Sequence, residues 1–163
     1  MNRVEKTIDL QRNGGLNCSQ AILTAFGEQF GMDAETAKML GRPWGGGMGH
    51  LSETCGYLTG AILVLAQAYK HNDEDQAREE VFEAVRELFS RFEKRRSKTS
   101  CKELLGADIS TDEGLKKIKQ EQLVKKICCG DGGIGQDVAE ILAELIGCPD
   151  NRFFCHTRHS ECV

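Results

Sequence analysis

Eight cysteines are the residues of this 163-residue chain with the most distinctive chemistry. They stand at positions 18, 55, 101, 128, 129, 148, 155 and 162. Their share, about 5%, is below that of a disulfide-stapled scaffold, and a chain of this length can form a core without staples. In a reducing compartment such a set more often binds metal or carries out redox chemistry. Some of the eight can equally be small buried hydrophobic residues.

Three of the cysteines share one local context. Cys18, Cys55 and Cys101 follow Asn, Thr and Ser, respectively, all of which cap helices well. Each is therefore expected at the first position of a helix. Free backbone N–H groups and the helix dipole favour an anion there, which predicts a lowered thiol pKa. Burial on the inward helix face would act in the opposite direction.

Helical periodicity prevails along the chain, with no convincing strand alternation. It predicts an all-α, single-domain bundle of about five to seven helices, interrupted by a glycine-rich loop. Residues 1–147 are expected to form this helical redox-type domain, and residues 148–163 a short Cys/His-rich tail. The predicted helices cover 18–30, 34–41, 55–71, 75–96, 101–106, about 112–127 and 135–147.

Simple up-and-down packing of these helices would gather the cysteines at one end of the bundle. Successive helices alternate in direction, so the starts of the helices at Cys18, Cys55 and Cys101 meet at that end. The helix over 112–127 would deliver Cys128 and Cys129 to it. These five cysteines are the catalytic candidates, and the sequence leaves open which member of the vicinal pair takes part.

The loop "GRPWGGGMGHLS" (41–52) contains glycines that can lie close to such a site. It has neither the Lys-Ser/Thr ending of a P-loop nor the GxGxxG spacing. We expect Gly45, Gly46, Gly47 and Gly56 to let the backbone approach the cysteines and donate N–H groups to sulfur. These glycines are the cofactor-binding candidates. A flexible surface loop is the alternative.

Together these residues resemble the family of redox-active proteins named for a C-GCAxxG-C-C cysteine pattern. The matching segments are "NCSQAILTAFGEQFG", "GGGMG", "TCGYLTGAILVL", "SCKELLG" and a cysteine at 128 or 129. Tyr57 stands where the family pattern carries Ala, which predicts crowded packing beside Cys55. The resemblance implies a helical fold and a redox role for Cys18, Cys55, Cys101 and one of the vicinal pair. A similar arrangement accompanies haem in split-Soret cytochromes c.

Four such thiols permit three kinds of chemistry. They can cycle between dithiol and disulfide, hold an iron–sulfur cluster, or hold zinc, which usually takes ligands from closer sequence pairs. Which of these applies is open, and the cofactor is unknown. Covalent haem is not expected, because CxxCH is absent. The candidate metal ligands are Cys18, Cys55, Cys101 and Cys129, with a second set in the tail comprising Cys155, His156, His159 and Cys162.

Composition narrows the remaining classes. A net charge of −4 and 6% aromatic residues give no basis for nucleic-acid binding. The absence of a long apolar run and of a signal-peptide core predicts no membrane span and a cytoplasmic location. The resulting hypothesis is a protein of electron transfer or thiol–disulfide chemistry with an unknown redox partner, an oxidoreductase if it is an enzyme. The alternative is an iron–sulfur or zinc module without activity of its own. Apolar helix faces leave room for a homodimer.

Overall fold

The computed structural model describes residues 1–147, and within them it shows nine α-helices and no strand. The all-α fold class is thereby confirmed. The predicted tail, with Cys155, His156, His159 and Cys162, lies outside the described residues. The helices are α1 (Arg3–Arg12), α2 (Cys18–Gly27), α3 (Ala34–Gly41), α4 (Gly45–Met48), α5 (Gly56–Ala68), α6 (Glu74–Arg96), α7 (Cys101–Leu105), α8 (Asp112–Glu121) and α9 (Ile134–Gly147). Single turns η1 (Glu28–Phe30), η2 (Arg42–Trp44) and η3 (Val124–Cys128) connect some of them.

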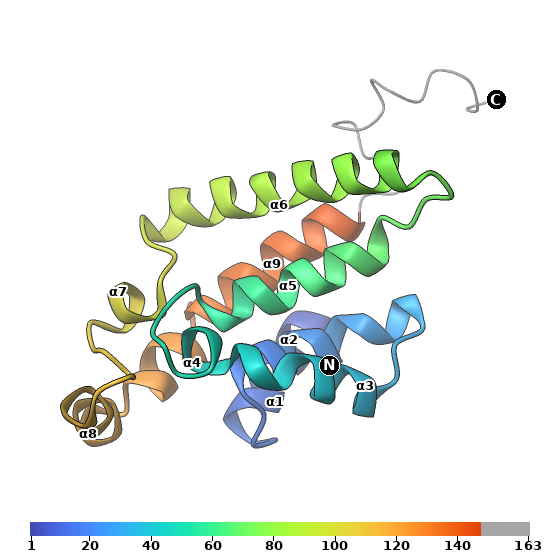
Figure 1. Cartoon of the computed structure of the whole chain (residues 1–163). Coiled ribbons are helices and arrows are strands. Elements are labelled where there is room, and N and C mark those ends of the chain that lie inside the picture. Colours follow the sequence, from blue (N-terminus) through green and yellow to red (C-terminus); the bar gives the residue numbers. More distant parts are fainter. Residues whose placement is uncertain (148–163) are drawn as a thin grey trace.

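The core of the bundle lies where α2, α5 and α9 meet. Helix α5 is the most apolar helix of the three, and most of its residues are buried because neighbours cover it on several sides. Helix α6 lies alongside α5 and α9, α1 packs against α2 and α9, and α3 packs against α2 (Figure 1). The short helices α4 and α7, together with α8, gather at one end of the bundle. The largest fully buried side chains include Tyr57, Phe26, Phe92, Ile22, Leu58 and Leu88.

Helix α1 was not among the helices that the sequence predicts. Its start is set by a capping box, in which the Asn2 side chain accepts from the Glu5 N–H and the Glu5 carboxylate accepts from the Asn2 N–H. Only Thr7 is fully buried in this helix. The apolar pattern is therefore weak, and packing against α2 and α9 is what completes the helix.

The start of α5 differs by one residue from the expected one. Cys55 is the N-cap of α5, and Gly56 is its first helical residue. Thr54 does not cap the helix, because it forms an isolated antiparallel bridge with Ser100. Cys18 and Cys101, in contrast, occupy the first positions of α2 and α7, behind Asn17 and Ser100 caps.

The predicted helix over 112–127 is two elements. Helix α8 ends at Glu121, and its C-cap Gln122 adopts a left-handed conformation with φ 54°. The next segment, η3, is a π-helical turn. An extra residue in that turn rotates the side chains that follow it relative to a continuous α-helix. Across residues 1–147, no helix combines the length and apolarity that a membrane crossing needs.

The glycine-rich segment forms a left-handed turn. Gly46, Gly47, Met48, Gly49 and His50 have φ values of 65°, 70°, 64°, 67° and 64°. Glycine adopts this conformation without steric cost, whereas Met48 and His50 adopt it at a cost in backbone strain. Two backbone hydrogen bonds close the turn: the Ser52 N–H donates to Gly46 O at 3.2 Å, and the Glu53 N–H donates to Gly47 O at 3.1 Å. We call residues 45–52 the glycine strap.

Candidate cysteine redox site

Cys18 lies at the start of α2, where α5 and the glycine strap come closest to it. A Cβ atom at Gly56 would collide with the Cys18 sulfur and would lie 2.8 Å from the Trp44 carbonyl oxygen. Only a glycine therefore lets α5 begin beside this thiol. Backbone N–H groups of Gly46, Ser19 and Gly56 lower the pKa of this thiol, against the larger effect of burial. Two of the predicted glycines thus lie at Cys18 itself.

Cys55 and Cys101 are brought together by two chain segments that run side by side. The Cys55 N–H donates to Thr99 O at 2.8 Å, and the Cys101 N–H donates to Glu53 O at 2.6 Å. These bonds flank the bridge between Thr54 and Ser100. The start of α5 and the start of α7 are therefore fixed next to each other, although 46 positions separate the two cysteines.

The strap also touches Cys101. A Cβ atom at Gly47 would lie 2.8 Å from the Cys101 Cβ atom and 2.6 Å from the Glu53 nitrogen. Gly45 lies against Asn17, whose side-chain Cγ would be 2.7 Å from an added Cβ. The strap thus packs between the cap of α2 and the start of α7.

The vicinal cysteines have different surroundings. Cys128 is half-buried and packs against both the main core and a smaller cluster of Leu105, Ile109, Ile118 and Leu123. Cys129 is 3% exposed, and its sulfur lies 3.6 Å from Val124 O and 3.9 Å from Lys125 O within its own turn. Its carbonyl oxygen accepts from Arg12 of α1. Cys129 is therefore held by bonds within its own turn and by the contact of its carbonyl oxygen with α1.

Electrostatic interactions link Cys18, Cys55, Cys101 and Cys128. Burial raises the pKa of Cys55, and Cys18 and Cys101 raise it further. Burial is likewise the main cause of the raised pKa of Cys128, and Cys55, Cys18, Cys101 and Cys129 add to it. For Cys101, burial and then Cys18 raise the pKa to about 12. Like charges disfavour each other's ionisation, so these effects are consistent with thiols that share one end of the bundle.

The predicted lowering of the thiol pKa values is wrong. Burial raises the pKa of Cys18 more than the N–H groups of Gly46, Ser19 and Gly56 lower it. A short helix start supplies only a few donors, whereas removing water from around a thiolate destabilises its whole charge. The four cysteines are consequently neutral thiols at neutral pH when no other group compensates their charge.

No group of three or more His, Cys, Asp or Glu side chains among residues 1–147 is arranged to hold a metal ion. The four thiols in their present positions therefore do not form a single-ion site. The candidate tail ligands lie beyond the described residues.

Tyr57 is a neighbour of the site that the sequence did not assign a role. It is fully buried, and its hydroxyl donates to the Gln11 side-chain oxygen of α1. An added Cβ at Gly135 of α9 would lie 2.5 Å from the Tyr57 hydroxyl. Burial raises the pKa of Tyr57, and the nearby Cys18 and Cys128 add to this effect. The signal for this residue in the sequence was that Tyr57 stands where the family pattern carries Ala.

A comparison with family models matches residues 16–145 to the family described as "Putative redox-active protein (C_GCAxxG_C_C)". The matched region contains Cys18, Cys55, Cys101, Cys128 and Cys129. The chain belongs to this family, and the family description gives it a redox role. No curated protein and no solved structure matched the chain.

Proposed function

We propose that the redox chemistry of this protein is thiol–disulfide chemistry at four cysteines, Cys18, Cys55, Cys101 and Cys128. The observation that carries the proposal is the packing of four separate elements: the Cys18 sulfur lies against Gly56, backbone bonds fix the starts of α5 and α7 side by side, and Cys101 and Cys128 pack on one cluster. A site built from α2, α5, α7 and η3 depends on the tertiary fold, unlike a set of isolated core cysteines.

The first reacting pair is Cys18 and Cys55. The Cys18 sulfur packs against Gly56, the residue that directly follows Cys55. Cys18 is half-buried and Cys55 is buried. We therefore assign to Cys18 the contact with an outside reactant and to Cys55 the role of the resolving thiol.

The second pair is Cys101 and Cys128. Both are half-buried, and both pack on the same small cluster around Leu105 and Ile118. Oxidation of each pair breaks two S–H bonds, forms one S–S bond and releases two protons and two electrons. The electrons go to a two-electron acceptor such as the disulfide of a partner protein, which is reduced to a dithiol.

Burial has a consequence for the reduction potential of these pairs. Surroundings that stabilise a thiolate favour the reduced state of a cysteine pair, so its disulfide is a strong oxidant. Here the surroundings disfavour thiolates, so the reduced form gains no such stabilisation. We therefore expect the site to favour the disulfide and to act as a reductant towards its partner.

The test counts thiols in a chain whose tail cysteines 148, 155 and 162 are replaced by Ser, which leaves five thiols. After anaerobic purification and reduction, mild oxidation with diamide should leave one thiol per chain. Peptide mapping should identify that thiol as Cys129 and find Cys18 linked to Cys55. Five remaining thiols, or an oxidised Cys129, would contradict the proposal.

Elemental analysis of the same anaerobic sample separates the alternatives. Brown protein with stoichiometric iron and sulfide would mean that the four thiols rearrange around a cluster, and stoichiometric zinc would mean a metal-binding module. Either result replaces thiol–disulfide chemistry as the function. Colourless, metal-free protein that loses four thiols supports it.

A further inference from the structure

Helix α6 has one face that nothing in the described chain covers. It lies along an edge of the bundle, with α5 and α9 on one side (Figure 1). Its buried residues, Ala84, Leu88 and Phe92, face those helices. Phe82 instead leaves 55% of its surface exposed. Phe89 is half-buried and comes seven residues later, so both rings belong to nearly the same stripe of the helix.

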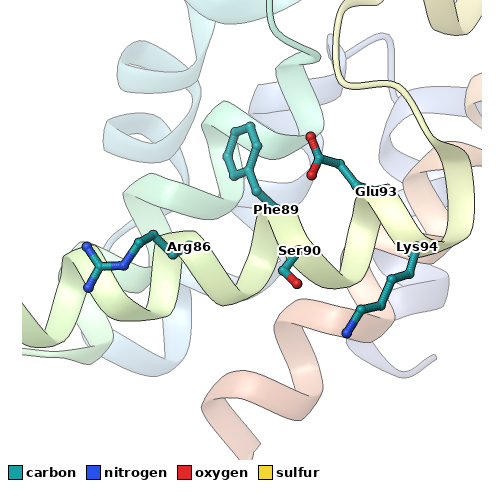
Figure 2. A pocket seen from close by; sticks show the side chains of 5 residues that line it. All are labelled: Arg86, Phe89, Ser90, Glu93 and Lys94. Carbon is teal, nitrogen blue, oxygen red and sulfur yellow. The ribbon is translucent and has the colours of Figure 1, made fainter.

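A shallow groove of about 520 Å³ adjoins this stripe. It is lined by Arg86, Phe89, Ser90, Glu93 and Lys94. Figure 2 shows Phe89 and Glu93 rising from one edge of the helix and Ser90 and Lys94 leaving from the other. An aromatic ring bordered by charged side chains has the composition of a protein interface, with an apolar centre and a polar rim.

Charge is segregated along α6. The half over 74–84 carries five acidic residues and one basic residue, and the half over 85–96 carries five basic and two acidic residues. Three of those basic residues, Arg91, Arg95 and Arg96, form ion pairs with acidic residues of α9. The side chains of Glu79, Glu83, Arg86, Glu93 and Lys94, in contrast, form no ion pair or hydrogen bond within residues 1–147. Of these, Glu93 is the one acidic side chain in the basic half.

We propose that this face of α6 binds the same face of a second copy of the chain, with the two helices antiparallel. In that orientation the acidic half of each α6 faces the basic half of its partner, whereas a parallel arrangement would place like charges together. One face carries the exposed ring, the groove and unpaired charges of both signs. The face is therefore complementary to a second copy of itself, as a two-fold interface requires. This inference is independent of the cysteine chemistry.

The first test uses sedimentation velocity over a range of protein concentrations under reducing conditions. The native chain should form a dimer, and Phe82→Glu should raise the dissociation constant roughly tenfold or more. Met39→Glu is the matched control, because Met39 of α3 is 56% exposed and gains the same charge. It should leave the dissociation constant unchanged, and circular dichroism should show equal helicity in all three proteins.

A native chain that stays monomeric at all concentrations would overturn the proposal. Equal effects of Phe82→Glu and Met39→Glu would overturn it as well.

The second test addresses orientation. Glu83→Lys and Lys94→Glu should each weaken the dimer, since each removes an opposite-charge contact and adds a repulsive one. The double variant Glu83→Lys/Lys94→Glu should bind more tightly than either single variant. Added salt should weaken the native dimer more than it weakens the dimer of Glu83→Gln/Lys94→Gln, in which both charges are removed. A double variant that is weaker than both single variants would overturn the antiparallel orientation.

Discussion

Cys128 and Cys129 are chemically identical neighbours, but η3 gives their side chains different surroundings. Cys128 packs against two hydrophobic clusters, whereas the Cys129 sulfur lies against carbonyl oxygens of its own turn. The difference arises from a π-helical turn, in which the Cys129 N–H donates to Val124 O at 3.2 Å. A π-turn at a functional site is a common way to redirect one side chain.

We expect the two positions to respond differently to substitution. In the background without tail cysteines, Cys128→Ser should leave Cys101 without its oxidation partner. Diamide should then oxidise two thiols per chain instead of four. Cys129→Ser should still lose four, because its sulfur takes no part. The measurement is the thiol count before and after oxidation, and a greater loss of oxidation in Cys129→Ser would reverse the assignment.

The residues of the glycine strap are determined by the backbone conformation that the strap adopts. Gly46, Gly47 and Gly49 all have positive φ, so each prefers glycine on conformational grounds. Their surroundings nevertheless differ. An added Cβ at Gly47 meets Glu53 and Cys101, whereas at Gly49 it meets only the Pro43 oxygen at 3.9 Å. Gly47 is therefore required both for the turn and for the close approach to the cysteines.

Comparing Gly47→Ala with Gly49→Ala separates these two requirements. Gly49→Ala should cost about 1 kcal/mol of unfolding free energy, from backbone strain alone. Gly47→Ala should cost about 2–4 kcal/mol, because it adds a clash with neighbouring backbone. It should also speed alkylation of Cys101 by iodoacetamide, measured by peptide mass spectrometry. Equal effects of the two variants on stability and alkylation would contradict a role of the strap in covering Cys101.

For the molecule as a whole, the buried thiols couple folding to pH. In the unfolded chain a cysteine ionises near its ordinary pKa of 9.0, whereas folded Cys101 ionises at about 12. The pKa values of Cys18, Cys55 and Cys128 are raised as well. Above about pH 9 the unfolded chain therefore binds fewer protons than the folded chain, and the free energy of unfolding falls as pH rises.

Urea unfolding under anaerobic, reducing conditions can measure this dependence. Between about pH 8 and about pH 10 the free energy of unfolding should decrease, because the unfolded thiols ionise and the folded ones do not. Cys101→Ser should make the decrease smaller, since one raised pKa is removed. A stability that is constant or rises over this range would show that the thiols are not protected from ionisation by the fold.

Much of the architecture follows from local sequence signals. The caps Asn17, Asp33 and Ser100 set the starts of α2, α3 and α7 as expected. The apolar stripe over 75–96 corresponds to α6, and Gly106 ends α7 in a left-handed conformation. These features depend on hydrogen bonds and periodicity within a few residues, so the chain specifies them without reference to the rest of the fold.

The sequence by itself thus determined an all-α chain, the residue types of the site and the family to which they belong. Only the tertiary structure decided that Cys55 caps α5, that Cys128 and Cys129 have different surroundings, and that burial outweighs the helix starts in setting the thiol pKa values. The reason is that each depends on groups distant in sequence: the pairing of Thr54 with Ser100, the tie from Arg12 to Cys129, and the water excluded by α2, α5 and the strap. Solvent exclusion is a property of the packed molecule, and no spacing of residues along the chain records it.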